Sequence, residues 1–250
     1  MPVPPRRRLI RAAPALIALL AALLLSGCEV PSFGFPDAAS EQADKVRDLW
    51  RGSMTAGLVV AVGVWGLIAW SLVRYRRRSD DVPHQVADNL PIEAVYITIP
   101  ILIVCVLFFF TVRTDQAIDA GESGPPDVVV EVQGFQWQWQ FTYPDEDVVV
   151  IGSSGAEPPE MVLPVDRTIR FELDAVDVNH SFWVPRFLTK RDLIQGVDNE
   201  IDVHTTATGT FAGRCAEFCG LDHWRMNFTV RVVPEAEYRA WLAEQRDGGS

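Results

Sequence analysis

The chain is 250 residues long, which gives room for one ordinary domain and a few membrane-spanning segments. Its net charge of −11 is uneven, because residues 1–113 hold 12 Lys and Arg against 9 Asp and Glu, whereas residues 114–250 hold 10 against 24. A strongly acidic domain favours a basic protein partner and argues against nucleic acid. Four scattered cysteines exclude a disulfide-stapled scaffold.

The N-terminal stretch predicts a signal peptide over residues 1–27. Several arginines precede an apolar run from Ala12 to Leu25, which is the pattern of a secretory signal. The run ends in Leu25-Ser26-Gly27-Cys28, which resembles the lipobox of bacterial lipoproteins and implies cleavage before Cys28 and lipid attachment to its sulfur. We favour this interpretation over an uncleaved anchor helix, for which the run is short. Residues 28–53 then form an extracytoplasmic segment, in which Ala39 to Arg51 has the pattern of a short amphipathic helix.

Two apolar stretches predict a transmembrane helical hairpin over residues 54–113. Residues 54–73 and 94–112 carry no charge, and each is long enough to cross a bilayer. The arginines at 74 and 76–78 follow the first stretch, and the positive-inside rule places this connecting loop in the cytoplasm. The chain beyond residue 113 then lies outside the cytoplasmic membrane, on the side to which the signal peptide directs Cys28.

After a linker over residues 114–126, which contains Gly121, Gly124, Pro125 and Pro126, the pattern changes to short β-strands. Residues 128–132, 168–173, 201–204 and 228–233 have the composition of strands, and Gly, Pro and Asp clusters separate them at the spacing of a β-sandwich. Residues 134–141 alternate aromatic side chains with Gln, which predicts one strand with an aromatic face. Residues 234–246 predict a terminal amphipathic helix. The sandwich domain therefore covers residues 127–250.

One twelve-residue stretch, Cys215 to Met226, holds two thiols, an imidazole and a thioether: Cys215, Cys219, His223 and Met226. Thiolate and thioether are soft ligands that select copper, or zinc less readily, over cations that prefer oxygen. A Met after Cys and His is typical of an electron-transfer copper site. Two thiolates four residues apart could both bridge a pair of metal ions. The alternatives are a small-loop disulfide, which leaves His223 and Met226 unexplained, and a structural zinc site.

The pattern Cys-x-Glu-x-Cys-Gly-x-x-His-x-x-Met resembles the CuA loop of cytochrome c oxidase subunit II. The resemblance implies a cupredoxin-like Greek-key sandwich behind the two-helix hairpin, with a further ligand at His180, in Asp177-Val178-Asn179-His180-Ser181. It implies that Cys215 and Cys219 bridge two coppers, one completed by His180 and Met226, the other by His223 and the backbone carbonyl of Glu217. The Glu217 side chain resembles the family's ligand to a magnesium ion at the interface with subunit I.

The same resemblance assigns roles to two residues outside the loop. Gly134-Phe135-Gln136-Trp137-Gln138-Trp139 is similar to the family's aromatic stretch, in which the first Trp, here Trp137, receives the electron from the donor haem. Phe135 replaces the family's His and Gln138 its Tyr, which puts the details of donor docking in question. Glu93, at the start of the second membrane helix, resembles a Glu near the entrance of a proton channel.

We therefore expect subunit II of a respiratory cytochrome c oxidase in a bacterial cytoplasmic membrane, with its copper domain on the extracytoplasmic face. Electrons would pass from a c-type cytochrome through the copper centre to the haem of subunit I, for reduction of oxygen to water coupled to proton translocation. The main alternative is a membrane-tethered copper carrier or assembly protein, which would keep an exposed, adaptable site. A quinol-oxidising relative would lack the copper ligands, and a soluble nitrous-oxide-reducing enzyme would lack the paired membrane helices.

Overall fold

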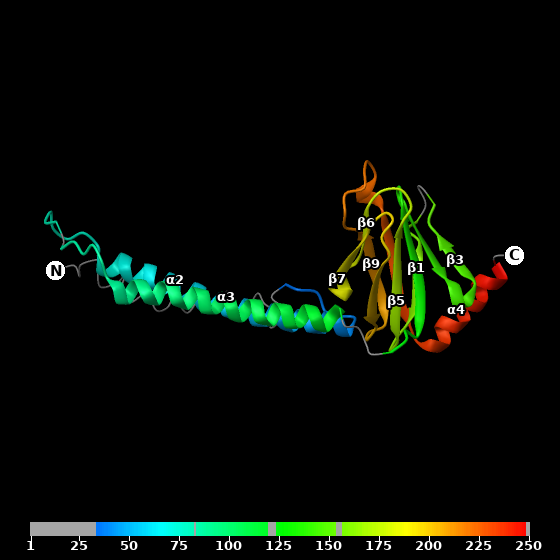
Figure 1. The fold of residues 1–250 in the computed structure, drawn as a ribbon, viewed down its shortest axis with the longest axis horizontal. Coiled ribbons are helices and arrows are strands. Elements are labelled where there is room, and N and C mark those ends of the chain that lie inside the picture. The colour runs from blue at the N-terminus through cyan, green and yellow to red at the C-terminus, as the bar shows by residue number, and fades with distance from the viewer. Residues whose placement is uncertain (1–33, 83, 120–123, 154–156, 249–250) are drawn as a thin grey trace, which may run out of the picture. The chain divides into compact units, whose positions relative to one another are not determined.

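The computed structural model describes residues 34–82, 84–119, 124–153 and 157–248. The expected signal peptide and Cys28 lie outside these residues. In the described part of the chain, two long helices precede ten strands in two sheets, and a short helix ends the chain (Figure 1). This is the fold class that the sequence predicts.

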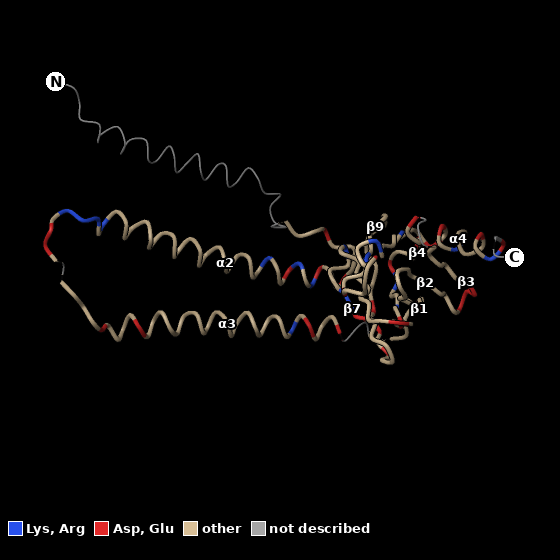
Figure 2. The backbone as a smooth tube through the Cα atoms, turned by 90° about the horizontal axis from the view of Figure 1, so that it is seen from above, with Lys and Arg blue, Asp and Glu red and all other residues tan. Residues whose placement is uncertain are grey.

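The two long helices are α2 (Glu41–Arg74) and α3 (Leu90–Asp119). Both are long and apolar enough to cross a membrane, and their apolar side chains are largely exposed. Lys and Arg gather where α2 ends and the connecting loop begins, whereas the middle of each helix carries no charge (Figure 2). An apolar surface of this length is stable only against lipid or other apolar helices.

Both helices extend beyond the apolar stretches. The expected short helix over residues 39–51 is continuous with the first span, since Gly52 and Ser53 do not interrupt the backbone ladder. Helix α3 runs six residues past Arg113, into the expected linker, because no Gly or Pro occurs before Gly121. Pro100 lies inside α3, as membrane helices tolerate.

The sandwich consists of two five-stranded sheets. The first has the order β3 (Val148–Ile151), β2 (Gln138–Tyr143), β1 (Val128–Phe135), β5 (Thr168–Ala175) and β8 (Asn199–His204). The second has the order β4 (Glu160–Pro164), β10 (Asn227–Val233), β9 (Gly209–Cys215), β6 (His180–Val184) and β7 (Thr189–Leu193). The β1–β5 and β4–β10 pairs are parallel, and the remaining neighbours are antiparallel.

Alternate residues of the central strands point into the space between the sheets, which is the period-2 pattern of half-buried strands. Aromatic rings fill its centre, where Phe182 and Phe228 stack at 5.0 Å and Trp139 meets Phe228 edge-on at 5.2 Å. Three one-turn helices connect strands: η1 (Pro144–Glu146), η2 (Pro185–Phe187) and η3 (His223–Arg225). Helix α4 (Glu235–Gly248) buries Tyr238 and Leu242, and its Trp241 packs on Tyr143.

The aromatic run at 134–141 is a hairpin and not the single strand that its alternation predicts. Strand β1 ends at Phe135, Gln136 and Trp137 form a two-residue turn, and β2 begins at Gln138. The turn is held by a distant residue, because the Gln136 N–H donates to the Asp177 carboxylate at 2.7 Å. Period-2 alternation continues through a two-residue turn, so the sequence pattern could not reveal it.

Candidate metal centre

The predicted ligands come together at one end of the second sheet. His180 opens β6 and Cys215 closes β9, and these strands are neighbours in the sheet. Phe182 pairs with Cys215, and residues two apart share a face, so His180 projects on the same side as Phe182. The loop from Cys215 to Met226 closes on itself through the Cys215 N–H, which donates to the Met226 carbonyl at 2.9 Å.

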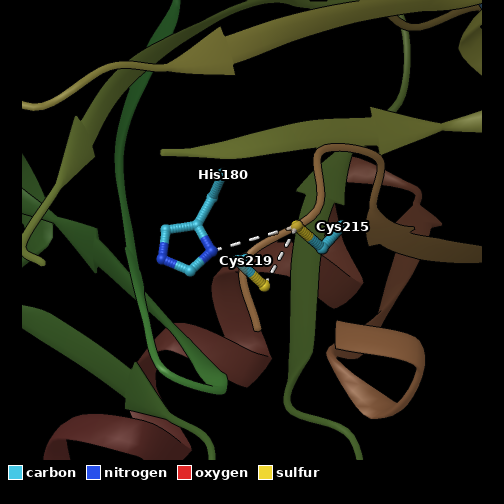
Figure 3. Close-up of side chains that lie close together, drawn as sticks. All are labelled: His180, Cys215 and Cys219. Carbon is cyan, nitrogen blue, oxygen red and sulfur yellow. Dashed lines mark hydrogen bonds between the residues drawn. The ribbon is translucent and has the colours of Figure 1, made fainter. Parts of the chain in front are cut away.

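Five side chains and one carbonyl form the group. The Cys215 Sγ lies 3.9 Å from His180 Nδ1, 3.9 Å from Cys219 Sγ and 3.2 Å from the carbonyl oxygen of Glu217. Figure 3 shows His180 and both cysteines pointing toward one another. The Cys219 Sγ in turn lies 3.6 Å from His223 Nδ1 and 3.8 Å from Met226 Sδ. The structure thus brings together all six residues that sequence reasoning assigned to the metal.

The donor set fits a soft metal ion. A sulfur separation of 3.9 Å is far longer than the roughly 2.05 Å of a disulfide, and both cysteines are free. Metal–thiolate bonds of about 2.3 Å would allow both sulfurs to contact the same ion. His180, Cys215, Cys219 and Met226 are all at most 5% exposed, whereas the Glu217 side chain is exposed. His223 is half-buried. A group with four of its five side chains buried is unlike the exposed, adaptable site of a metal carrier.

Electrostatics explain why two such thiols would hold a cation. Burial by itself raises the pKa of Cys215, but hydrogen bonds with His180 and with backbone groups outweigh it and lower that pKa to about 7. Burial and the neighbouring Cys215 charge raise the pKa of Cys219. One thiol therefore ionises readily and opposes ionisation of the other, so a bound cation is needed for both to be thiolates.

Asp177, which sequence reasoning did not assign, holds the His180 ring. Its carboxylate lies 3.0 Å from His180 Nε2 and accepts N–H bonds from Gln136 and Val178, each at 2.7 Å. Burial lowers the pKa of His180, but its bonds with Cys215 and Asp177 raise it overall. With Nε2 bonded to Asp177, Nδ1 is left to face the sulfurs. The position of an Asp three residues before the His was the signal available in the sequence.

Trp137 contacts the same loop. Its Nε1 donates to the Cys219 carbonyl at 3.1 Å, and the Gln136 side-chain amide donates to the same oxygen at 2.7 Å. Gly220 makes this approach feasible, because a Cβ there would lie 3.0 Å from Gln136 Nε2 and 3.2 Å from the Trp137 ring. Its φ of +120° also favours glycine. Trp137 is partly buried against the core and one hydrogen bond away from a cysteine of the site.

Glu93 is not part of this group. It lies in the first turn of α3, where its carboxylate accepts the Asn89 N–H at 3.0 Å and the Asn89 side chain accepts the Ile92 N–H at 3.3 Å. This reciprocal bonding caps the helix. It gives Glu93 a structural role that is independent of any proton channel.

These features define a class of protein: a cupredoxin-like β-sandwich with a buried sulfur- and imidazole-lined metal site, attached to two helices suited to a membrane. Residues 128–233 match the family described as cytochrome c oxidase subunit II, periplasmic domain, and residues 29–113 match its transmembrane domain. The chain belongs to the cytochrome c oxidase subunit II family. It is accordingly a component of an oxidoreductase complex and a membrane protein with a periplasmic domain, and the His/Cys/Cys group is consistent with copper binding.

Two full-length relatives agree with this assignment. A probable cytochrome c oxidase subunit 2 of Streptomyces avermitilis is 38% identical over 280 residues, covering 96% of this chain and 88% of the relative. Cytochrome c oxidase subunit 2 of Mycobacterium bovis is 34% identical, covering 94% and 82%. Among solved structures, the periplasmic domain of subunit II of the Bradyrhizobium japonicum oxidase is 32% identical, with a TM-score of 0.47, and covers 51% of this chain and 99% of its own.

Proposed function

We propose that this chain is the electron-accepting subunit of a respiratory cytochrome c oxidase. It would take single electrons from a c-type cytochrome at a dinuclear copper site and pass them to the haem of subunit I, where oxygen is reduced to water with proton translocation. The observation that carries the proposal is the convergence of two buried cysteine sulfurs, 3.9 Å apart, with His180, His223 and Met226 around them. This donor set, in this family, suits an electron-transfer site better than a carrier.

The resemblance to the family assigns the residues that would hold the metal. Cys215 and Cys219 are central and would bridge the two coppers, with His180 and Met226 on one copper and His223 and the Glu217 carbonyl on the other. The bound copper pair would supply a one-electron couple shared over two metals. The chain's own part is to keep the ligands fixed, so that little rearrangement accompanies a change of charge. Asp177 orients His180, the Trp139 indole N–H holds the Met226 carbonyl at 3.3 Å, and burial excludes water.

Trp137 would receive the electron from the donor haem. Its indole is partly buried and donates a hydrogen bond to the backbone carbonyl of Cys219. Between a donor haem seated over this ring and the Cys219 thiolate would lie only the Trp137 ring, this hydrogen bond and the covalent bonds of Cys219. The exposed side chains of Phe218, Leu221 and Trp224 belong to the same loop and offer apolar surface beside it.

The membrane arrangement is also a proposal. Helices α2 and α3 would each cross the bilayer, with the arginine-rich loop in the cytoplasm and the sandwich outside. Residues 1–27 would be removed and Cys28 lipidated. The domain organisation would be an N-terminal segment over 28–53, a hairpin over 54–113, a linker over 114–126 and the copper domain over 127–250.

Two further roles follow from the family alone. Glu217 would bind magnesium at the interface with subunit I, which agrees with its exposed carboxylate and with a carbonyl that faces Cys215. Glu93 would lie near the entrance of a proton channel in addition to capping α3.

The experiment is rapid mixing of reduced c-type cytochrome with the assembled oxidase carrying Trp137→Phe. The variant keeps an aromatic ring but loses the hydrogen bond to Cys219, so the rate of electron acceptance should fall at least about tenfold, equivalent to about 1.4 kcal/mol in the barrier. Trp241→Phe is the matched control, since it makes the same change on α4, where Trp241 packs on Tyr143 outside the copper loop, and it should retain the rate. Equal rates in both variants would remove Trp137 from the path.

A further inference from the structure

Residues 39–43, which we call the strap, lie at the start of membrane helix α2 but pack as part of the sandwich. The Ala39 N–H donates to the Arg186 carbonyl at 3.0 Å, and the Ala39 carbonyl accepts from the Thr206 N–H at 3.1 Å. Ser40 forms an antiparallel bridge with Thr205. Ala39 and Ser40 have no exposed surface, and Ala39 belongs to the sandwich core. The strap is therefore bonded as an additional edge segment of the sandwich.

Side chains of the strap join the helix start to the sandwich. The Ser40 hydroxyl accepts the Ala43 N–H at 3.1 Å, which caps α2, and also donates to the Phe187 carbonyl at 3.4 Å. The Gln42 side-chain oxygen accepts the His204 N–H at 3.1 Å, and Gln42 is 2% exposed. Ser40 thus both caps the membrane helix and bonds to the sandwich. Helix α2 and the sandwich therefore cannot move independently without breaking buried hydrogen bonds.

An ion pair joins the other membrane helix, α3, to the sandwich. Asp119, the last residue of α3, pairs with Arg191 of β7 at 2.7 Å. The strap contacts the end of β8 and Asp119 contacts β7, and these strands belong to different sheets. Each membrane helix therefore has its own attachment to the sandwich, in addition to the covalent connection from α3 to β1.

We infer that the strap and the Asp119–Arg191 pair are positioning elements that set the distance between the metal site and its electron acceptor in the membrane. The inference rests on the proposed function. One electron leaves the haem iron of a c-type cytochrome, which is oxidised, and ends at the haem iron of subunit I, which is reduced, while no bond forms or breaks. Electron transfer slows steeply with distance. None of the strap residues is among the proposed copper ligands, so their effect is confined to position.

The test uses the assembled oxidase with Gln42→Ala and Arg191→Gln combined, which removes one side-chain bond from each attachment. Rapid mixing measures two rates, acceptance from the cytochrome and onward transfer to haem. We expect onward transfer to slow on the order of tenfold, equivalent to about 1.4 kcal/mol in the barrier, because the rate of electron transfer falls as the distance between the two centres grows. Acceptance and the electron paramagnetic resonance spectrum of the copper should stay unchanged. Arg239→Gln, which breaks a surface pair on α4, is the control.

A disulfide cross-link between the strap and the sandwich distinguishes an effect on the position of the sandwich from an effect on its stability. Opposed residues of an antiparallel bridge have Cα atoms about 4.5–5.5 Å apart, within the roughly 4.4–6.8 Å span of a disulfide. Adding Ser40→Cys and Thr205→Cys to the double variant should restore onward transfer in the cross-linked molecules and not in the others. Should the double variant fail to assemble, Arg191→Gln alone serves, with a smaller slowing expected.

Two results would overturn the inference: onward transfer that stays at the unmodified rate, or loss of both rates together with an altered copper spectrum. The second would mean that the strap merely stabilises the fold. Failure of the proposed function is distinct, because the unmodified oxidase would then show no electron acceptance at this subunit.

Discussion

The two nitrogens of the His180 ring make different contacts. Nε2 bonds to Asp177 at 3.0 Å, while Nδ1 faces the Cys215 sulfur at 3.9 Å. Gly134 leaves space for the ring, because a Cβ there would lie 3.0 Å from His180 Cδ2. A small residue on one side and a carboxylate on the other therefore fix both the position and the orientation of a ligand that arrives from a strand remote from the cysteine loop.

Asp177→Ala should weaken copper binding. The substitution leaves His180 Nε2 buried without its carboxylate, and loss of such a supporting partner typically lowers metal affinity by about 10–100-fold. Competition with a copper chelator, on the full chain in detergent, measures the change. Asp174→Ala is the matched control, because Asp174 is an exposed carboxylate on β5 that accepts a hydrogen bond from Gln133 at 3.4 Å and is not part of the metal site. Equal affinities in the two variants would show that Asp177 does not support the site.

Tyr143, at the end of β2, connects the two sheets. Its hydroxyl donates to the Val162 carbonyl at 2.9 Å and accepts the Val162 N–H at 3.1 Å. Burial raises the pKa of Tyr143 well above its usual value near 10.0. The folded state thus favours the neutral phenol, which satisfies two backbone groups of β4 in the interior.

Tyr143→Phe should lower the free energy of unfolding by about 1–3 kcal/mol, because it leaves buried backbone groups of Val162 unpaired. The pKa of Tyr143 is higher in the folded than in the unfolded state. The stabilisation is therefore fully present below a pH of about 10 and is lost as the pH rises through the pKa of the folded state. Denaturant unfolding of the two proteins should therefore converge at alkaline pH. Tyr238→Phe is the control, because the Tyr238 hydroxyl is buried with no hydrogen-bond partner among the described residues. A Tyr143→Phe protein as stable as the wild type at neutral pH would contradict this role.

Elements with a regular pattern were predictable from the sequence, and contacts between distant residues were not. The apolar stretches within α2 and α3, four strands and the loop from Cys215 to Met226 follow from composition, period and spacing. The turn at Gln136 and Trp137 depends on Asp177, 41 residues away, and the strap depends on partners near residues 186–206. Local patterns carry no information about such partners, so the strap was expected to be only part of a short amphipathic helix.

The negative charge of residues 114–250 should govern how fast the protein encounters a cytochrome donor. Residues 114–250 carry 24 acidic against 10 basic side chains, a surface suited to a basic cytochrome. Raising the ionic strength from about 10 mM to about 100 mM shortens the Debye length from about 30 Å to about 10 Å. The second-order rate of electron acceptance by the oxidase should then fall by about tenfold or more. Onward transfer within the complex, measured in the same traces, should not change. An acceptance rate independent of salt would contradict electrostatic steering.

The proposed function requires this chain to hold two coppers that share one unpaired electron. It is tested most directly by counting copper in the full chain, refolded under reducing conditions and loaded with the metal, and recording its electron paramagnetic resonance spectrum. We expect about two coppers per chain and hyperfine splitting from two nuclei coupled to one unpaired electron, and the loss of this signal in Cys219→Ser. One copper per chain with an ordinary four-line spectrum, unchanged in Cys219→Ser, would contradict the dinuclear site and favour a copper carrier.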